Sequence, residues 1–373
     1  MTIRKTALAI TACLAALAGL LAVPGQTAVR GQVSTAPREF FGIAPQTSLT
    51  EDDVAHMRAA RIGTVRWPLI WEGVQPSRNG DFNWEGFDQV VETAAHGGLR
   101  VFPFLYGTPS WLSHKYTILP IDSPAKRRAW FAFARAAAER YGPHGEFWRE
   151  HWAGSADPVP KIPIRDWQVW NEANFFYFAT PASPERYARL LKQTNTAIKR
   201  AEPGARVVLT GLFGDPTAKP PNGLPAVDFL KRLYRVPGIR SSFDGVALHP
   251  YADGAARLED LIEEVRELIL ENRDPGARLY ITEMGWGSQN NPEIVSFERG
   301  VRGQVRELRL AYRYLIANRA RLNLKAAFWF TWKDLPEVCN FCDSVGFFHE
   351  GPRLRPKPAW HAFVRLTGGR ARP

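Results

Sequence analysis

The chain has 373 residues, of which 45% are hydrophobic and 23% are charged. This is the balance of an ordinary globular protein with a large core, and one domain of about 250 to 350 residues fits it at least as well as two smaller ones. The formal net charge of +11 is compatible with an acidic polysaccharide or an anionic cell surface as a partner, although solubility alone also accounts for it.

Residues 1–28 differ in composition from the rest of the chain. Arg4 and Lys5 precede an uncharged run that ends at Val23. This order predicts a secretory signal peptide that is cleaved near Ala28, and therefore export to the extracellular space or the cell envelope. Cleavage lowers the net charge from +11 to +9 and leaves no stable membrane span. A retained anchor is the alternative, but the run is close to the short limit for crossing a bilayer.

Strand-like and helix-like segments alternate along residues 29–373. Short apolar runs indicate strands, and amphipathic runs with capping residues at their starts indicate helices. The expected strands are 39–44, 63–71, 100–106, the stretch 166–174, 206–211, 243–248, 278–282 and 325–332. The expected helices are one opening at 49–53, then 84–96, 123–141, 183–202, 226–234, 258–272, 297–318 and 357–366. The Pro-rich connection 142–163 is expected to be a surface loop or a flap over a site.

Eight strands that alternate with eight helices predict parallel βαβ units. Over this length the pattern favours an α/β fold of the (β/α)8 TIM-barrel type, with residues 29–373 forming a single domain. No Gly-x-Gly-x-x-Gly turn follows the first strand and no Gly-Lys-Ser/Thr loop is present. A dinucleotide-binding or P-loop fold is therefore not supported.

Polar and aromatic residues stand at the carboxyl ends of several predicted strands, where a barrel of this type carries its active site. These residues are Arg66, Asn171, Glu172, His249, Tyr251, Glu283 and Trp332. Strand alternation places Gln168, Trp170 and Glu172 on one face of the fourth strand. It likewise places Leu279, Ile281 and Glu283 on one face of the seventh. Both glutamates are therefore expected to point toward the barrel axis.

Two facing carboxyl groups are what cleavage of a glycosidic bond requires. If they stand about 5 to 5.5 Å apart, one acts as a nucleophile and the anomeric configuration is retained. Each residue also has an ordinary structural role when taken singly. Glu172 can cap a helix, Glu283 and Arg66 can form structural ion pairs, and His249 can be a hydrogen-bonded strand-end residue.

The motif Trp170-Asn171-Glu172, with Glu283 at the end of the seventh strand in Ile281-Thr282-Glu283-Met284-Gly285-Trp286, resembles the clan A glycoside hydrolases. The resemblance covers essentially the whole chain after residue 28. The segment from Tyr141 to Trp148 and the closing Lys357-Pro358-Ala359-Trp360 are similar to family 39-like and family 5-like bacterial members. Many of those members carry Asn-Glu-Pro-Asn where this chain has Ala173 in the third position.

The resemblance implies a single (β/α)8 catalytic domain and a role for each strand-end residue. Glu172 would be the general acid and base, and Glu283 the nucleophile. Asn171 would bind the sugar 2-hydroxyl, and Arg66 would keep Glu283 ionised by lowering its pKa. His249 and Tyr251 would orient the nucleophile or bind sugar. Trp332 would form an apolar floor under the sugar ring.

Neither metal ions nor other cofactors are expected. The eight histidines show no His-Glu-x-x-His or His-x-His spacing, so metal catalysis is not supported. Cys339 and Cys342, the two cysteines after residue 28, are expected to form a small loop disulfide in an oxidising compartment. A zinc site would need two further ligands, and no second cysteine pair is present.

Arginines recur at three- and four-residue steps along 297–318, which predicts one basic helix face. They are Arg299, Arg302, Arg306, Arg309 and Arg313. A solvated outer face is the ordinary interpretation, and contact with an anionic polymer is the alternative. No recognised nucleic-acid-binding module accompanies the charge, so nucleic acid is not expected as a partner.

The sequence thus predicts a secreted retaining glycosidase that acts on an oligo- or polysaccharide with β-linkages. A non-catalytic glycan-binding protein on the same scaffold is the rival from another class, and a transglycosylase is the rival among enzymes. A pure binder needs neither an acid nor a nucleophile, so the two glutamates argue against the first rival.

Overall fold

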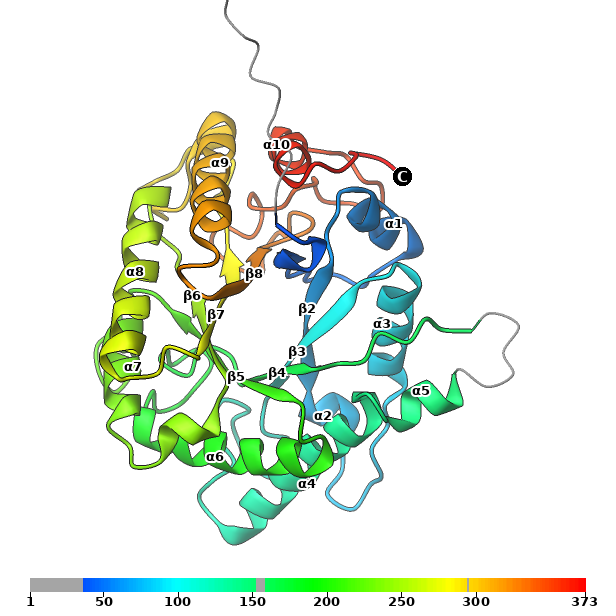
Figure 1. Cartoon of the computed structure of the whole chain (residues 1–373), viewed down its shortest axis with the longest axis vertical. Coiled ribbons are helices and arrows are strands. Elements are labelled where there is room, and N and C mark those ends of the chain that lie inside the picture. The colour runs from blue at the N-terminus through cyan, green and yellow to red at the C-terminus, as the bar shows by residue number, and fades with distance from the viewer. Residues whose placement is uncertain (1–35, 152–157, 294) are drawn as a thin grey trace, which may run out of the picture. The chain divides into compact units, whose positions relative to one another are not determined.

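Eight parallel strands form a closed barrel in the order of the sequence, and helices surround it (Figure 1). The structure is a computed structural model that describes residues 36–151, 158–293 and 295–373. The strands are β1 (Phe41–Ile43), β2 (Thr64–Ile70), β3 (Arg100–Tyr106), β4 (Asp166–Val169), β5 (Arg206–Phe213), β6 (Gly245–His249), β7 (Arg278–Met284) and β8 (Leu324–Trp329). Pairing of β1 with β8 closes the barrel, which confirms the predicted (β/α)8 fold class.

The main helices occupy the predicted segments, within a few residues at each end. They are α1 (Glu51–Ala59), α3 (Glu85–His96), α4 (Pro124–Tyr141), α6 (Pro184–Ala201), α7 (Ala226–Tyr234), α8 (Ala255–Glu271), α9 (Gly300–Asn318) and α10 (Pro358–Thr367). Four short elements were not predicted because each spans about one turn. They are the 3-10 helices η1 (Arg38–Phe40) and η2 (Ile239–Ser242), and the helices α2 (Trp71–Val74) and α5 (Glu146–Glu150).

Local capping explains where several helices begin. Thr50 caps α1, since its hydroxyl accepts from the Asp53 amide while the Asp53 carboxylate accepts from the Thr50 amide. This reciprocal pair satisfies two amides that the first turn leaves without partners. Ser123 and Ser183 cap α4 and α6 through their hydroxyls alone, which accept from the Lys126 and Arg186 amides, and each precedes a proline in the first turn.

Two hydrophobic layers stabilise the barrel. The smaller layer fills the interior and consists of Phe102, Val208, Ala247, Tyr280, Ala326 and Phe328. The larger layer includes the outward-facing strand residues and the inner faces of the helices. The interior is therefore a packed core rather than a channel, and it separates the two ends of the barrel.

The described residues of the connection, 142–151 and 158–163, do not form a flap over the strand-end residues. The connection links α4 to β4, so it runs to the amino end of β4, and Ile164 directly after it bonds Tyr141 at the end of α4. The strand-end residues lie at the opposite ends of the strands. Residues 152–157 of this connection are outside the described part of the chain.

The described elements all belong to one compact unit, Val33–Pro373. The predicted signal peptide, residues 1–28, lies outside the described residues. Among the helices that the structure describes, none combines the length and apolar character that a bilayer span needs.

Candidate active site

Arg66 on β2 connects the carboxyl ends of three strands. Its guanidinium is fully buried and lies 4.1 Å above the ring centre of Phe104. Its Nη1 donates to Glu283 Oε1 at 2.6 Å, and its Nη2 donates to Asn171 Oδ1 at 2.6 Å. Its Nε donates to Gln168 Oε1 at 3.0 Å. The guanidinium of Arg66 therefore sets the positions of side chains at the ends of β4 and β7. Gln168, for which the sequence predicted no role, holds the guanidinium through its Nε.

Glu172 is held by a histidine from β6. His249 Nδ1 lies 2.7 Å from Glu172 Oε1, and both side chains are buried. Burial lowers the pKa of His249 well below its ordinary value, and the charge of Arg66 adds to this, so the imidazole is neutral. Gly211 makes the arrangement sterically possible, because a Cβ there would stand 2.1 Å from His249 Nε2. A neutral imidazole can donate to the ionised carboxylate or accept from the protonated one.

Glu283 is surrounded by hydrogen-bond donors. Arg66 contacts Oε1, and the Tyr251 hydroxyl donates to Oε2 at 2.9 Å. Burial raises the pKa of Tyr251 well above its ordinary value, and the charge of Glu283 adds to this, so the phenol keeps the proton that it donates. His249 Nδ1 stands 3.6 Å from Oε2 as well.

The two carboxyl groups form a close, unequal pair. One oxygen of Glu172, one of Glu283 and one nitrogen of His249 all lie within 4.8 Å of one another. Burial raises the pKa of Glu172 well above its ordinary value, and the charge of Glu283 raises it further. Burial also raises the pKa of Glu283, but Arg66 and Tyr251 oppose that rise. When the pair holds a single proton, Glu172 therefore carries that proton and Glu283 carries the negative charge.

Arg66 acts on the pKa of Glu283 in the predicted direction, but its effect is not the largest one. Arg66 does lower the pKa of Glu283, but burial outweighs it and the net shift is upward. The reason is that the guanidinium and the carboxylate are buried together, so both lose the solvation that favours their charged forms.

The prediction that Gln168, Trp170 and Glu172 share one face of the fourth strand is wrong. β4 ends at Val169, and the next residues include two with left-handed backbone, Trp170 at φ 70° and Glu172 at φ 38°. Trp170 turns outward, where its Nε1 donates to the Phe178 carbonyl at 2.7 Å. Glu172 nevertheless faces inward, because the irregular backbone redirects it after the strand has ended.

Simple alternation also fails on β7. Tyr280 belongs to the interior cluster, whereas Leu279 and Ile281 belong to the outer core. Alternation from Leu279 would therefore point Glu283 outward as well. The pairing of β7 with β8 shifts register between Ile281 and Met284. Such an irregularity redirects a side chain, and here it turns Glu283 toward Arg66.

The departure at Ala173 has a structural counterpart. Its backbone amide donates to the Thr210 hydroxyl at 3.1 Å. Proline, which many of the resembled enzymes carry at this position, has no amide hydrogen for that bond. The next residue, Asn174, bonds the Phe213 amide and the Phe213 and Leu224 carbonyls. The loop that carries Glu172 is thus joined to the end of β5.

Trp332 was expected to lie beside the other strand-end residues, but it does not contact them. Its side chain is fully buried, its Nε1 donates to Asp53 Oδ1 at 2.7 Å, and its ring stands 4.6 Å from Phe348. β8 ends at Trp329, so Trp332 lies beyond the strand and packs toward α1 and α10. Trp332 was placed over the site as the last residue of an eighth strand over 325–332, and the strand ends three residues earlier.

We therefore expect Trp332→Phe to alter stability and not substrate binding. Loss of the indole donor leaves the buried Asp53 carboxylate with fewer partners, which costs about 1–3 kcal/mol. Chemical denaturation and steady-state kinetics on the same samples test this. A raised KM with an unchanged free energy of unfolding would contradict the placement of Trp332 in the core.

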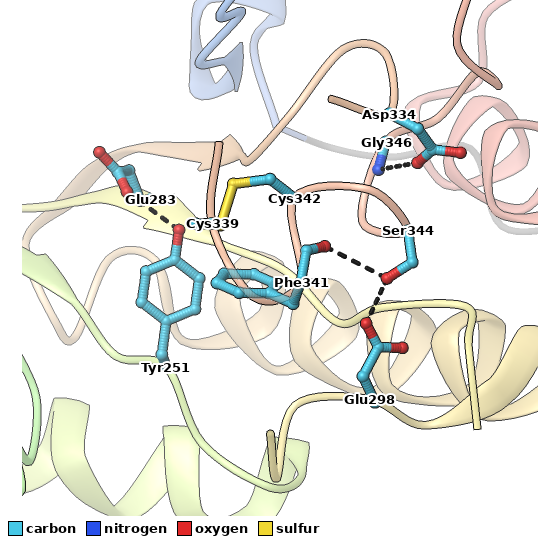
Figure 2. The surroundings of a disulfide bond; sticks show 9 residues. All are labelled: Tyr251, Glu283, Glu298, Asp334, Cys339, Phe341, Cys342, Ser344 and Gly346. Atoms are coloured by element: carbon cyan, nitrogen blue, oxygen red, sulfur yellow. Dashed lines mark hydrogen bonds between the residues drawn. A yellow bond between two sulfur atoms is a disulfide. The ribbon is translucent and has the colours of Figure 1, made fainter. Parts of the chain in front are cut away.

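A disulfide-closed loop supports Tyr251 from the side of β8. Cys339 and Cys342 form a disulfide, and Phe341 lies between them in sequence. The Phe341 ring packs edge-on against Tyr251, with 5.3 Å between ring centres, and the Tyr251 hydroxyl points to Glu283 (Figure 2). Ser344 anchors the end of the loop by bonding the buried Glu298. A continuous set of contacts thus connects the disulfide to the Glu283 carboxylate.

Phe341→Ala is expected to lower kcat by about tenfold to 10²-fold, because a misplaced catalytic group costs about that much. Tyr251 helps to lower the pKa of Glu283, so its misplacement should also move the acid limb of the pH profile of kcat/KM to higher pH. Reduction of the disulfide to two thiols by dithiothreitol should act in the same direction. Val338→Ala, at an exposed position of the same loop, is the control, and an equal effect there would contradict the role of Phe341.

Glu172, His249 and Glu283 also form a donor set that could hold a metal ion. The guanidinium of Arg66 already contacts Glu283 at 2.6 Å, and its positive charge opposes a second cation at that carboxylate. Two carboxyl groups and a neutral imidazole are suited to proton transfer as well as to holding a metal ion.

Comparisons with known proteins bear on the fold and on the class of enzyme. A family model described as beta-galactosidase matches residues 44–199. A family 39 glycoside hydrolase of the gut symbiont Bacteroides cellulosilyticus has a TM-score of 0.62 and 18% identity, covering 89% of this chain and 64% of its own. This chain therefore spans less than two-thirds of that protein.

Two further solved structures share the barrel. A family 39 beta-xylosidase from Caulobacter crescentus has a TM-score of 0.62 and 19% identity over 90% of this chain and 73% of its own. A thermostable mutant of a xylanase from Cellvibrio japonicus has a TM-score of 0.61 and 15% identity over 88% and 97%. A search of curated proteins finds no match. At these identities the solved structures show the fold, and together with the family model they support a clan A glycoside hydrolase and hence a glycosidase.

Proposed function

We propose that the protein is a retaining glycoside hydrolase that cleaves β-linked O-glycosidic bonds in an oligo- or polysaccharide. The observation that carries the proposal is the pair of buried carboxyl groups, in which one oxygen of Glu172 lies within 4.8 Å of one oxygen of Glu283. A retaining pair stands about 5 to 5.5 Å apart, whereas an inverting pair stands about 6.5 to 9.5 Å apart so that a water fits between. The unequal surroundings of Glu172 and Glu283 then assign the two roles.

In the first step Glu172 donates its proton to the leaving oxygen while Glu283 attacks the anomeric carbon. The glycosidic C–O bond breaks, a glycosyl ester forms on Glu283, and Glu172 becomes a carboxylate. Asn171 Oδ1 already accepts from Arg66, so its amide NH₂ group is left to donate to the sugar 2-hydroxyl.

In the second step Glu172 acts as a general base. Ester formation removes the negative charge of Glu283, which is one of the two causes that raise the pKa of Glu172. The pKa of Glu172 therefore falls in the intermediate, and its carboxylate takes a proton from the attacking water. The water oxygen then bonds the anomeric carbon, and Glu283 leaves with its charge restored.

Product stereochemistry tests the mechanism. Aryl β-xylosides, β-galactosides and β-glucosides form the first panel, since the compared proteins are described as beta-xylosidase and beta-galactosidase. Proton NMR of the fresh products of a cleaved substrate should show the β anomer first, because two displacements retain configuration. Initial release of the α anomer would sink the proposal, and activity should withstand EDTA.

We also propose that residues 1–28 direct export and are removed. Support comes from the basic start and apolar run of this segment and from the Cys339–Cys342 disulfide, which suits an oxidising compartment. Amino-terminal sequencing of protein recovered from the envelope or medium of an expressing bacterium should give a start near Val29. Recovery of intact Met1 in the cytoplasm would contradict export.

A further inference from the structure

A cavity of about 520 Å³ lies at the amino ends of the strands, opposite the catalytic pair. It is lined by the first residues of β2, β3, β4, β5 and β7 and by residues near the start of β8. Phe102, Tyr280 and Phe328 of the interior cluster close its inner end, with 5.4 and 5.5 Å between the ring centres of neighbouring pairs. Its size lies within the range of about 300–1,000 Å³ that small-molecule sites occupy.

The lining of this cavity is strongly basic. Six cationic side chains face two carboxylates, and the cations are Arg100, Lys161, Arg165, Arg206, Arg278 and Lys325. Asp166 is already held by Arg206 through two hydrogen bonds of 2.6 and 2.5 Å. Glu39 is already paired with Arg100 at 3.7 Å. The carboxylates of the cavity therefore neutralise two of the six cations.

Four cations remain without a carboxylate partner among the residues that the structure describes. Lys161 and Arg165 come from the segment that leads into β4, and Arg278 and Lys325 come from the starts of β7 and β8. β4 and β8 are four strands apart in the closed barrel, so the two pairs approach the cavity from different sides. Positive charges that lie close together repel one another. The pKa of Lys325 is accordingly lowered, mainly by burial and further by the charges of Arg278, Arg319 and Arg206.

We propose that this cavity binds a small molecule that carries at least two oxyanion groups, of the phosphate or carboxylate type. One group would lie against Arg278 and Lys325, and the other against Lys161 and Arg165. Arginine forms paired, charge-assisted hydrogen bonds with such groups, and lysine adds a point charge. The site is independent of the proposed function, since the interior core separates it from Glu172 and Glu283.

Titration calorimetry on the full purified chain tests the site. Pyrophosphate and citrate are the probes with two and three oxyanion groups, and inorganic phosphate is the probe with one. Sodium chloride at matched ionic strength controls for screening of the surface charge. We expect saturable binding of one molecule per chain for pyrophosphate or citrate. Phosphate should bind at least about tenfold more weakly, because a single group reaches only one of the two pairs. Preference between pyrophosphate and citrate identifies the type of oxyanion.

The double substitution Arg278→Gln and Lys325→Gln should weaken binding by about tenfold or more. The matched control is Arg302→Gln with Arg309→Gln, which removes two exposed charges from the outer face of α9. If the first variant does not fold, Lys161→Gln with Arg165→Gln removes the other pair from an exposed segment. No saturable binding, or equal losses in the control and the cavity variants, would overturn the site. Equal affinity for phosphate and pyrophosphate would overturn the two-group requirement. None of these outcomes bears on glycoside hydrolysis.

Discussion

Glu283→Ala should lower kcat by about 10⁴-fold or more, since removal of a covalent nucleophile acts on that scale. Among the described residues, Glu283 is the carboxylate that hydrogen-bonds both Arg66 and Tyr251. A 2-deoxy-2-fluoro glycoside of the cleaved sugar should label the native protein covalently, because the fluorine slows hydrolysis of the ester. Mass spectrometry of a digest should place the label on Glu283.

The matched control is Glu267→Gln on the exposed side of α8, which should keep native activity and labelling. Circular dichroism of both variants shows whether the barrel is intact. A Glu283→Ala protein that folds and still takes up the label at another residue would assign the nucleophile elsewhere. A native protein that binds the sugar but is never labelled would favour the non-catalytic glycan-binding protein.

Glu172→Ala should lower kcat/KM by about 10²- to 10⁴-fold on substrates whose leaving group needs a proton, because general acid catalysis usually contributes that much. With a dinitrophenyl leaving group the first step needs no proton, so the loss in kcat/KM should be much smaller. Azide should restore turnover as a glycosyl azide of retained configuration, because an anion attacks the ester without a general base. Rates for the two leaving groups, with and without azide, measure this.

The pH profile gives a second measurement on Glu172. The acid works only when protonated, and burial and the charge of Glu283 raise its pKa well above the ordinary value. Native kcat/KM should therefore be high below that pKa and fall as the pH rises through it. Glu172→Gln cannot titrate, so its alkaline limb should disappear while the acid limb of Glu283 stays. An unchanged alkaline limb in Glu172→Gln would mean that another group supplies the proton.

The barrel could be predicted because local sequence patterns indicate each of its strands and main helices. Each strand is a short apolar run and each main helix begins with a capping residue or amphipathic pattern, as Thr50 and Ser183 illustrate. These signals depend on residues close together in the chain, and their eightfold alternation leaves few ways to pair the strands. The same local patterns also place Asn171, Glu172 and Glu283 at strand ends.

The direction of side chains could not be predicted in this way. Trp332 was expected over the sugar because strand β8 was extended too far, and its burial against Asp53 depends on α1, which lies far away in sequence. The connection 142–163 left a surface loop and a flap as alternatives, because its length can be seen in the sequence whereas the end of the barrel that it reaches cannot. In both cases the missing information was which distant segment packs against the residue.

The sequence by itself determined the eightfold fold, the two glutamates and the residues that accompany them, because periodicity and strand ends are local properties. Only the tertiary structure decided that Glu283 turns inward, through the register shift between β7 and β8. It also decided that Glu172 holds the proton, because burial, the charge of Glu283 and the placement of Arg66 act together there. Distances between strands set these electrostatic effects, and such distances exist only when the barrel has closed.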